Sequence, residues 1–97
     1  MAGAGPAGAS AAIAALLAGA EVDLYDPSRF PRHKICGEFL SPGAPELLVR
    51  LGVWDRILRL KPTRYQRLGL HFRRTRKLCR LPDAGWGLSR YALDHLL

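Results

Sequence analysis

The stretch Gly3-Ala4-Gly5-Pro6-Ala7-Gly8 decides the fold of this chain. It satisfies the pattern G-x-G-x-x-G, in which the first glycine makes a tight turn, the second admits a pyrophosphate and the third lets a helix approach a strand. The backbone N–H groups and positive dipole of the following helix then favour a phosphate. Gly3, Gly5 and Gly8, with Pro6 and Ala7 between them, are therefore expected to bind the pyrophosphate of a dinucleotide.

The residues after the glycine motif support this interpretation. Pro6 to Ala18 are strong helix formers, and Gly19 offers a C-terminal stop. Glu21 to Tyr25 alternate polar and apolar, which predicts a strand that ends at Asp26, 18 positions after Gly8. An acidic residue there accepts hydrogen bonds from ribose hydroxyls and repels a 2′-phosphate, so FAD or NAD is favoured over NADP. The alternative for Asp26 is an ordinary turn aspartate before a proline.

The strand that should precede the glycine motif is missing from the sequence, because only Met1 and Ala2 stand before Gly3. In this fold that strand pairs with neighbours on both sides, so its absence leaves sheet edges exposed. We expect Met1 and Ala2 to form at most a stub. We also expect residues 1–97 to be the N-terminal part of a longer protein.

Further helices and strands are expected along the rest of the chain. The expected helices are Pro42–Leu51, Val53–Leu60 and Arg90–Leu97. The expected strands are Leu68–Phe72 and Lys77–Leu81, paired as a small β-hairpin, and Trp86–Leu88. Ser41 and Ser89 offer N-caps, and Gly52 offers a C-terminal stop. Together with the glycine motif, these elements predict an α/β fold that is a partial Rossmann-like domain with its first strand missing.

The composition is that of a soluble globular chain, with 48% hydrophobic and 24% charged residues. The apolar run Ala7–Ala20 is shorter than the ~20 residues of a membrane span, and Met1–Ala20 contains no Lys or Arg for a signal peptide. We expect a cytoplasmic protein. The sequence leaves open whether it contacts a membrane surface peripherally. Cys36 and Cys79 have no CxxC companion, and the three histidines lack ligand spacing, so no metal site is expected.

The chain is strongly basic, with a formal net charge of +7 and eleven of its fifteen Lys and Arg residues between Arg50 and Arg80. Tyr65, Phe72 and Trp86 are interleaved with or near this basic stretch, as in modules that bind single-stranded nucleic acid. A nucleic-acid-binding module is therefore the alternative function. An arginine-rich composition accounts for the charge equally well, and we expect no nucleic-acid partner.

Three segments together resemble a known family. They are Gly3–Gly8, then Asp26, and then Phe30 to Ala44 (FPRHKICGEFLSPGA). These segments resemble the FAD-dependent oxidoreductases related to geranylgeranyl reductases, within the broad p-hydroxybenzoate hydroxylase-like group. The segment is also similar to squalene monooxygenases and, less closely, to flavin-dependent halogenases. Gly87-Leu88-Ser89-Arg90 is similar to the family segment in which an arginine reaches the cofactor before a helix.

The resemblance implies FAD as the cofactor and a small isoprenoid-like or aromatic substrate, reduced or hydroxylated at the flavin. It implies that Arg32 and Arg90 donate hydrogen bonds to the diphosphate or ribityl chain, and that Cys36, Gly37 and Glu38 lie near the flavin. The alternatives are solvated surface arginines and a buried apolar cysteine. The family's second flavin-binding motif and most of its substrate domain are not in this sequence, so the isolated chain is expected to be a non-catalytic part of an FAD-dependent oxidoreductase or monooxygenase.

Overall fold

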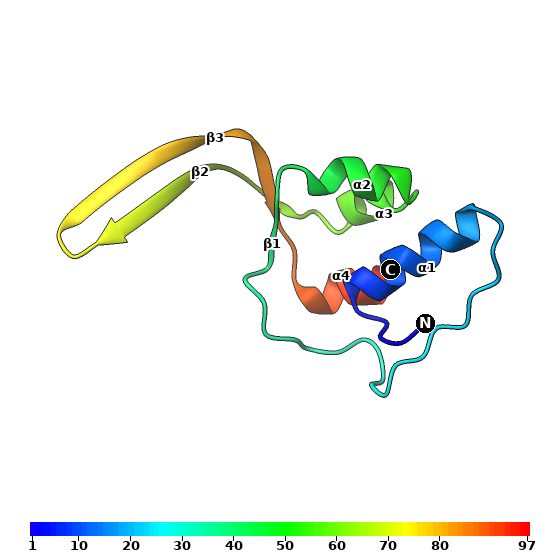
Figure 1. Cartoon of the computed structure of the whole chain (residues 1–97). Coiled ribbons are helices and arrows are strands. Elements are labelled where there is room, and N and C mark those ends of the chain that lie inside the picture. Colours follow the sequence, from blue (N-terminus) through cyan, green and yellow to red (C-terminus); the bar gives the residue numbers. More distant parts are fainter.

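Four helices form the body of the molecule, and a long β-hairpin projects from it (Figure 1). The computed structural model describes residues 1–97 and measures 53 × 26 × 21 Å along its principal axes. The helices are α1 (Pro6–Leu17), α2 (Ala44–Arg50), α3 (Trp54–Arg59) and α4 (Arg90–Leu96). The strands are β1 (Phe39–Leu40), β2 (Thr63–Phe72) and β3 (Thr75–Gly87).

Helix α1 follows the glycine turn directly. Gly3 adopts a φ of +95°, a conformation that glycine reaches without strain, and Gly5 is the N-cap residue in extended conformation. Pro6 occupies the start of the helix, where a missing N–H costs no hydrogen bond. The helix ends at Ala18, and Gly19 follows with a φ of +84°. The predicted helix over Pro6–Ala18 and the glycine stop are confirmed.

The predicted strand Glu21–Tyr25 is wrong. A single parallel bridge joins Ala2 to Tyr25, where the Gly3 N–H donates to the Tyr25 carbonyl and the Tyr25 N–H donates to the Met1 carbonyl. A strand needs a partner along its whole length to satisfy its backbone groups, and only Met1–Gly3 lie alongside this segment. The expected stub at Met1 and Ala2 is confirmed.

Helix α2 starts two residues later than predicted, at Ala44 rather than Pro42. Gly43 is its N-cap residue, and the Ser41 side chain makes no capping bond, so the predicted Ser41 cap is wrong. Instead the Ser41 carbonyl accepts the Ala44 N–H at 2.9 Å, which closes a turn over Pro42 and Gly43. Gly52, with a φ of +70°, ends the helix as predicted. The helix predicted over Val53–Leu60 is confirmed as α3.

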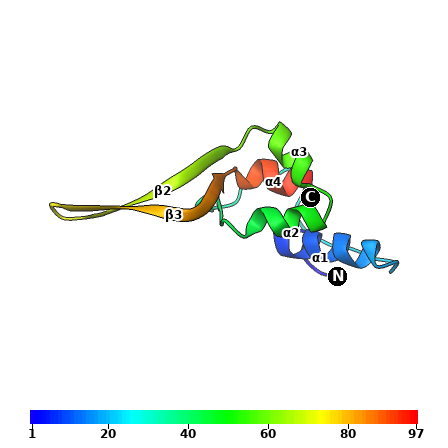
Figure 2. The ribbon, with the colours of Figure 1, turned by 90° about the horizontal axis from the view of Figure 1, so that it is seen from above.

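The sheet is antiparallel with strand order β1-β3-β2. The predicted hairpin is confirmed and is longer than expected, with Phe72 paired to Thr75 across the two-residue turn Arg73-Arg74. The separate strand predicted over Trp86–Leu88 is wrong, because Trp86 and Gly87 are the end of β3 and pair there with β1. Figure 2 shows the hairpin extending away from the helices in a second view.

The core is one small cluster where α2, α3 and α4 meet. It contains five buried residues: Leu48, Val53, Ile57, Leu88 and Leu93. Trp54 packs edge-to-face on Trp86 beside it, with 5.3 Å between ring centroids. Only nine of the 97 residues are buried, so this cluster holds most of the apolar contact that stabilises the helices.

Ile57→Ala is expected to destabilise the chain by about 2 to 5 kcal/mol, since Ile57 is fully buried and its loss leaves a cavity in this small core. Leu58→Ala, the next residue on α3 and 41% exposed, is the matched control and should cost much less. Urea unfolding followed by circular dichroism measures both. Equal losses for the two variants would contradict the placement of the core.

Candidate functional site

The glycine turn and the first turn of α1 are in direct contact. A Cβ atom placed on Gly8 would overlap the carbonyl oxygen of Gly3. Only a glycine at position 8 therefore lets the helix approach the turn this closely, which is the role expected for the third glycine of the motif. By position in the helix, the backbone N–H groups of Ala7 and Gly8 have no intrahelical acceptor.

Asp26 ties the glycine turn to the segment that follows α1. Its Oδ2 accepts the backbone N–H of Ala4 at 2.8 Å, and its Oδ1 accepts the N–H of Ser28 at 2.8 Å. The hydrogen bonds from Ser28 and Ala4, with the charge of Arg32 adding to them, lower the pKa of the Asp26 carboxyl below its ordinary value. The prediction that Asp26 lies beside the glycine turn is confirmed.

Arg32 reaches the same place from the loop after Asp26. Its Nη1 donates to the Ser28 hydroxyl at 2.6 Å, and its Nη2 lies 3.4 Å from Oδ2 of Asp26. The guanidinium stacks over the Phe30 ring at 4.7 Å. Its Nε is buried and has no hydrogen-bond partner. Arg32 is therefore held in place, and its buried Nε–H has no partner.

Arg90, the first residue of α4, also reaches Gly5. Its Nε and Nη2 donate to the two carboxylate oxygens of Asp94 at 2.7 and 3.0 Å, and these hydrogen bonds raise the pKa of the guanidinium above its ordinary value. A Cβ placed on Gly5 would lie 3.8 Å from Nη2 of Arg90 and 4.0 Å from Nη2 of Arg32. Two guanidinium groups thus lie close to Gly5 at the head of α1.

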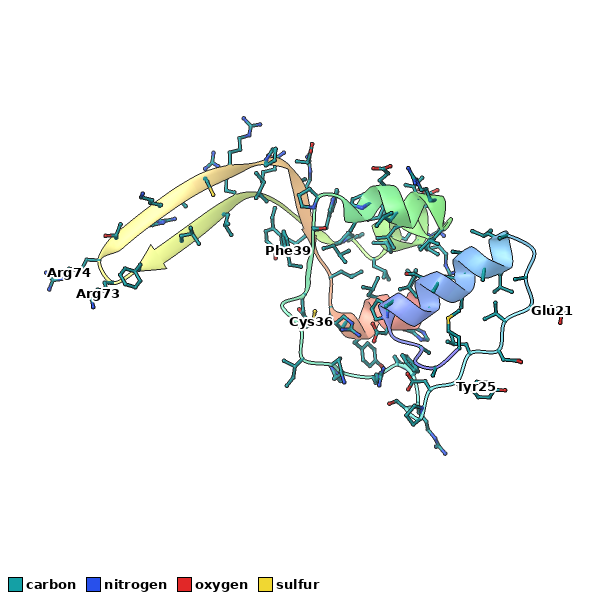
Figure 3. The ribbon with its side chains drawn as sticks, viewed as in Figure 1. Glu21, Tyr25, Cys36, Phe39, Arg73 and Arg74 are labelled. Carbon is teal, nitrogen blue, oxygen red and sulfur yellow. The ribbon has the colours of Figure 1, made fainter.

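The segment Cys36-Gly37-Glu38 lies only partly at this site. The Cys36 thiol is exposed, so Cys36 is not a buried apolar residue. It lies on the segment that leads to Phe39 (Figure 3), and its nearness to Arg90 adds to the raised pKa of that guanidinium. Glu38 adopts a φ of +53°, and its carbonyl accepts the Leu88 N–H at 2.9 Å where the chain turns into β1. Gly37 lines a hollow beside the hairpin with Phe39 and Tyr65. Gly37 and Glu38 therefore lead away from the glycine turn.

The structure brings together most of the site residues that the sequence indicated. The residues around the head of α1 are Gly3, Gly5, Pro6, Ala7, Gly8, Asp26, Arg32, Cys36 and Arg90. Whether they bind a cofactor stays a prediction. The sequence analysis missed Asp94, whose only signal is its i+4 spacing from Arg90.

The hairpin carries the strongest concentration of positive charge. Thr63–Arg80 contains seven Lys and Arg residues and no acidic residue. Because cross-strand partners share a face and faces alternate along a strand, Leu68, Leu70 and Phe72 lie on one face with Lys77. Arg67 and Arg80 lie on the other face with Leu78. Both faces of this exposed ribbon therefore carry apolar and basic side chains. None of the helices is both long and apolar enough to cross a membrane.

The chain is similar over about half of its length to proteins named menaquinone reductase. It is 51% identical over 51 residues to a menaquinone reductase of Mycolicibacterium smegmatis, and 49% identical over 51 residues to menaquinone reductases of two Mycobacterium tuberculosis strains. Each match covers 53% of this chain and 12% of the relative. No family model and no solved structure matches the chain. The similarity supports an oxidoreductase in general and does not single out geranylgeranyl reductases.

Gly8→Ala is expected to destabilise the chain by about 1 to 3 kcal/mol, because the added methyl group forces α1 away from the Gly3 carbonyl. Gly43→Ala is the matched control, since Gly43 has a negative φ and open space around its Cα. Thermal unfolding of both variants checks this. A Gly8→Ala chain as stable as the Gly43→Ala chain would refute the close approach.

The Asp26 carboxyl should titrate below the ordinary aspartate value in the folded chain. Because its folded pKa lies below its unfolded pKa, its stabilising effect is complete above the unfolded value of about 3.9 and is lost as pH falls through the folded pKa. The protection of the Ala4 and Ser28 amides against hydrogen exchange, measured by NMR as the intrinsic rate at each pH divided by the observed rate, should fall over that interval.

Asp26→Asn should remove this pH dependence, whereas Asp55→Asn, on the distant helix α3, should leave it in place. Protection at Ala4 and Ser28 that stays constant as pH falls in the unmodified chain would show that the carboxylate does not hold the turn.

Proposed function

We propose that this chain is the FAD-binding part of a flavin-dependent oxidoreductase that acts on a quinone or a related isoprenoid-bearing molecule. The observation that carries the proposal is the pair of guanidinium groups close to Gly5, where a helix begins after a G-x-G-x-x-G turn. Two positive charges beside a helix N-terminus suit a diphosphate.

The residues fit the adenosine diphosphate half of FAD. Gly5 has no side chain to fill the space next to the two guanidinium groups, and the buried Nε of Arg32 is a donor without a partner. The N–H groups of Ala7 and Gly8 supply further donors. Backbone and arginine donors would thus hold the phosphates of the cofactor.

The Asp26 carboxylate can accept a further hydrogen bond from a ribose hydroxyl. A carboxylate accepts about four hydrogen bonds. Oδ2 already has two donors, Ala4 and Arg32, whereas Oδ1 has one, Ser28. The remaining site on Oδ1 would accept a ribose hydroxyl, and the negative charge would disfavour a 2′-phosphate, which supports FAD over a phosphorylated dinucleotide.

The reaction class follows from the relatives and from the family resemblance. When bound, a flavin supplies hydride and electron transfer at its ring, and the protein supplies binding and orientation. The mycobacterial relatives are named menaquinone reductases, which supports reduction of a quinone or of its isoprenoid chain. The proposal includes two reaction types, a geranylgeranyl reductase-like reduction and a monooxygenase reaction.

We further propose that residues 1–97 form part of a Rossmann-like FAD domain in a longer flavoprotein. The match spans 12% of the relatives' length, and apolar side chains such as Leu16, Leu17 and Leu47 are more than half exposed. Further polypeptide packed on these surfaces would bury them. The activity of the whole enzyme belongs to that larger assembly.

The alternative function, nucleic-acid binding, rests on the basic hairpin. Two of the three aromatic residues it would use are already engaged, since the Tyr65 ring lies 6.4 Å from Phe39 and Trp86 packs on Trp54. Phe72 is exposed, but the Arg73 guanidinium lies over its ring at 5.5 Å. A salt titration with an oligonucleotide separates the two functions, because phosphate contacts made by side-chain charges weaken steeply with salt.

The 97-residue chain is expected to bind FAD in the micromolar range, with ADP competing for the same site. Ordering several residues of the turn costs roughly 1 to 2 kcal/mol each, which takes a nanomolar site into the micromolar range. FAD fluorescence titrations with and without ADP measure this, and FMN, which lacks the adenosine, is the control. FMN binding as tight as FAD, or FAD that ADP does not displace, would contradict the proposal.

A further inference from the structure

We propose that Asp94 is a positioning residue that aims the Arg90 guanidinium at the diphosphate site over Gly5. The inference rests on the proposed function and concerns a residue that never touches the cofactor. Asp94 lies on α4, one helical turn beyond Arg90.

The contact between the two side chains fixes the direction of the guanidinium. Both carboxylate oxygens of Asp94 are used, on Nε and Nη2 of Arg90. This two-point grip is planar and leaves Nη1 and the second Nη2 hydrogen for a ligand. The Ser89 hydroxyl accepts the Ala92 N–H at 3.2 Å and so fixes the start of the helix that carries both residues.

Helix stability does not explain the Arg90–Asp94 pair. Arg90 is in the first turn and Asp94 is in the last, which opposes the helix dipole and is the weaker order for an i,i+4 pair. The Asp94 side chain is fully buried, and removing a charged pair from water costs free energy. A solvent-exposed ion pair would stabilise the helix without this cost of removing charges from water.

Helix α2 of the same chain carries an exposed i,i+4 ion pair in the usual order. Glu46 and Arg50 on α2 are also i,i+4, with the acid first, in the order that the dipole favours. Both side chains are more than two-thirds exposed, and their contact is 2.7 Å. The comparison indicates that the buried, reversed pair on α4 serves to hold Arg90 over the glycine turn, 3.8 Å from the Cβ position of Gly5.

The test is an NMR titration of the 97-residue chain with ADP, and with adenosine as the phosphate-free probe. Asp94→Asn keeps the size of the side chain and removes the charge and one acceptor, so ADP should bind at least tenfold more weakly, with adenosine unchanged. Asp94→Glu should recover part of the loss. Glu46→Gln, the matched control, should bind ADP as the unmodified chain does. The Arg90 Nε–H signal should exchange slowly with water in the unmodified chain and fast in Asp94→Asn.

A double substitution separates positioning from a general structural role. In an Arg90→Lys background, Asp94→Asn should weaken ADP binding no further, because there is no planar fork left to aim. An equal loss in both backgrounds, or an unchanged ADP affinity in Asp94→Asn, overturns the inference and leaves the proposed function standing. If the unmodified chain binds no ADP, the proposed function and the inference both fail.

Discussion

The hydrogen bond from the Ala4 N–H to the Asp26 carboxylate is the contact on which the candidate site depends. Residues 1–5 have little other support, since their remaining pairing is one parallel bridge at Ala2 and Tyr25 and one hydrogen bond from the Met1 ammonium to the Asp23 carbonyl. The Asp26 carboxylate contacts the glycine turn, the Ser28 turn and Arg32. With the turn fixed there, α1 begins close to Arg90 of α4.

The helices and the hairpin differ in how many buried apolar residues stabilise them. The α2–α4 cluster buries five apolar residues and carries Arg90 on its last helix. The hairpin, by contrast, has no buried residue along β2. Its two strands are joined by backbone pairing, so its contribution lies in its surface and not in the stability of the site.

Local patterns in the sequence predicted the helices and the hairpin well. The helix over Pro6–Ala18 depends on propensity and on two flanking glycines, and both act within a few residues. The strand over Glu21–Tyr25 failed because pairing is not local, and alternation alone supplies no partner. β1 was missed for the same reason, since its two residues pair with Trp86 and Gly87. Asp94 was missed because its burial comes from the packing of α4. The i+4 spacing from Arg90 does not by itself indicate that burial.

The central claim is that the glycine turn, Asp26, Arg32 and Arg90 form one site for a dinucleotide diphosphate. A backbone and arginine side-chain NMR map of the 97-residue chain during addition of FAD tests it most directly. The account predicts the largest shifts at the amides of Gly3–Ala9 and at the Nε–H groups of Arg32 and Arg90. Shifts concentrated on the hairpin, with the glycine turn unmoved, would contradict it.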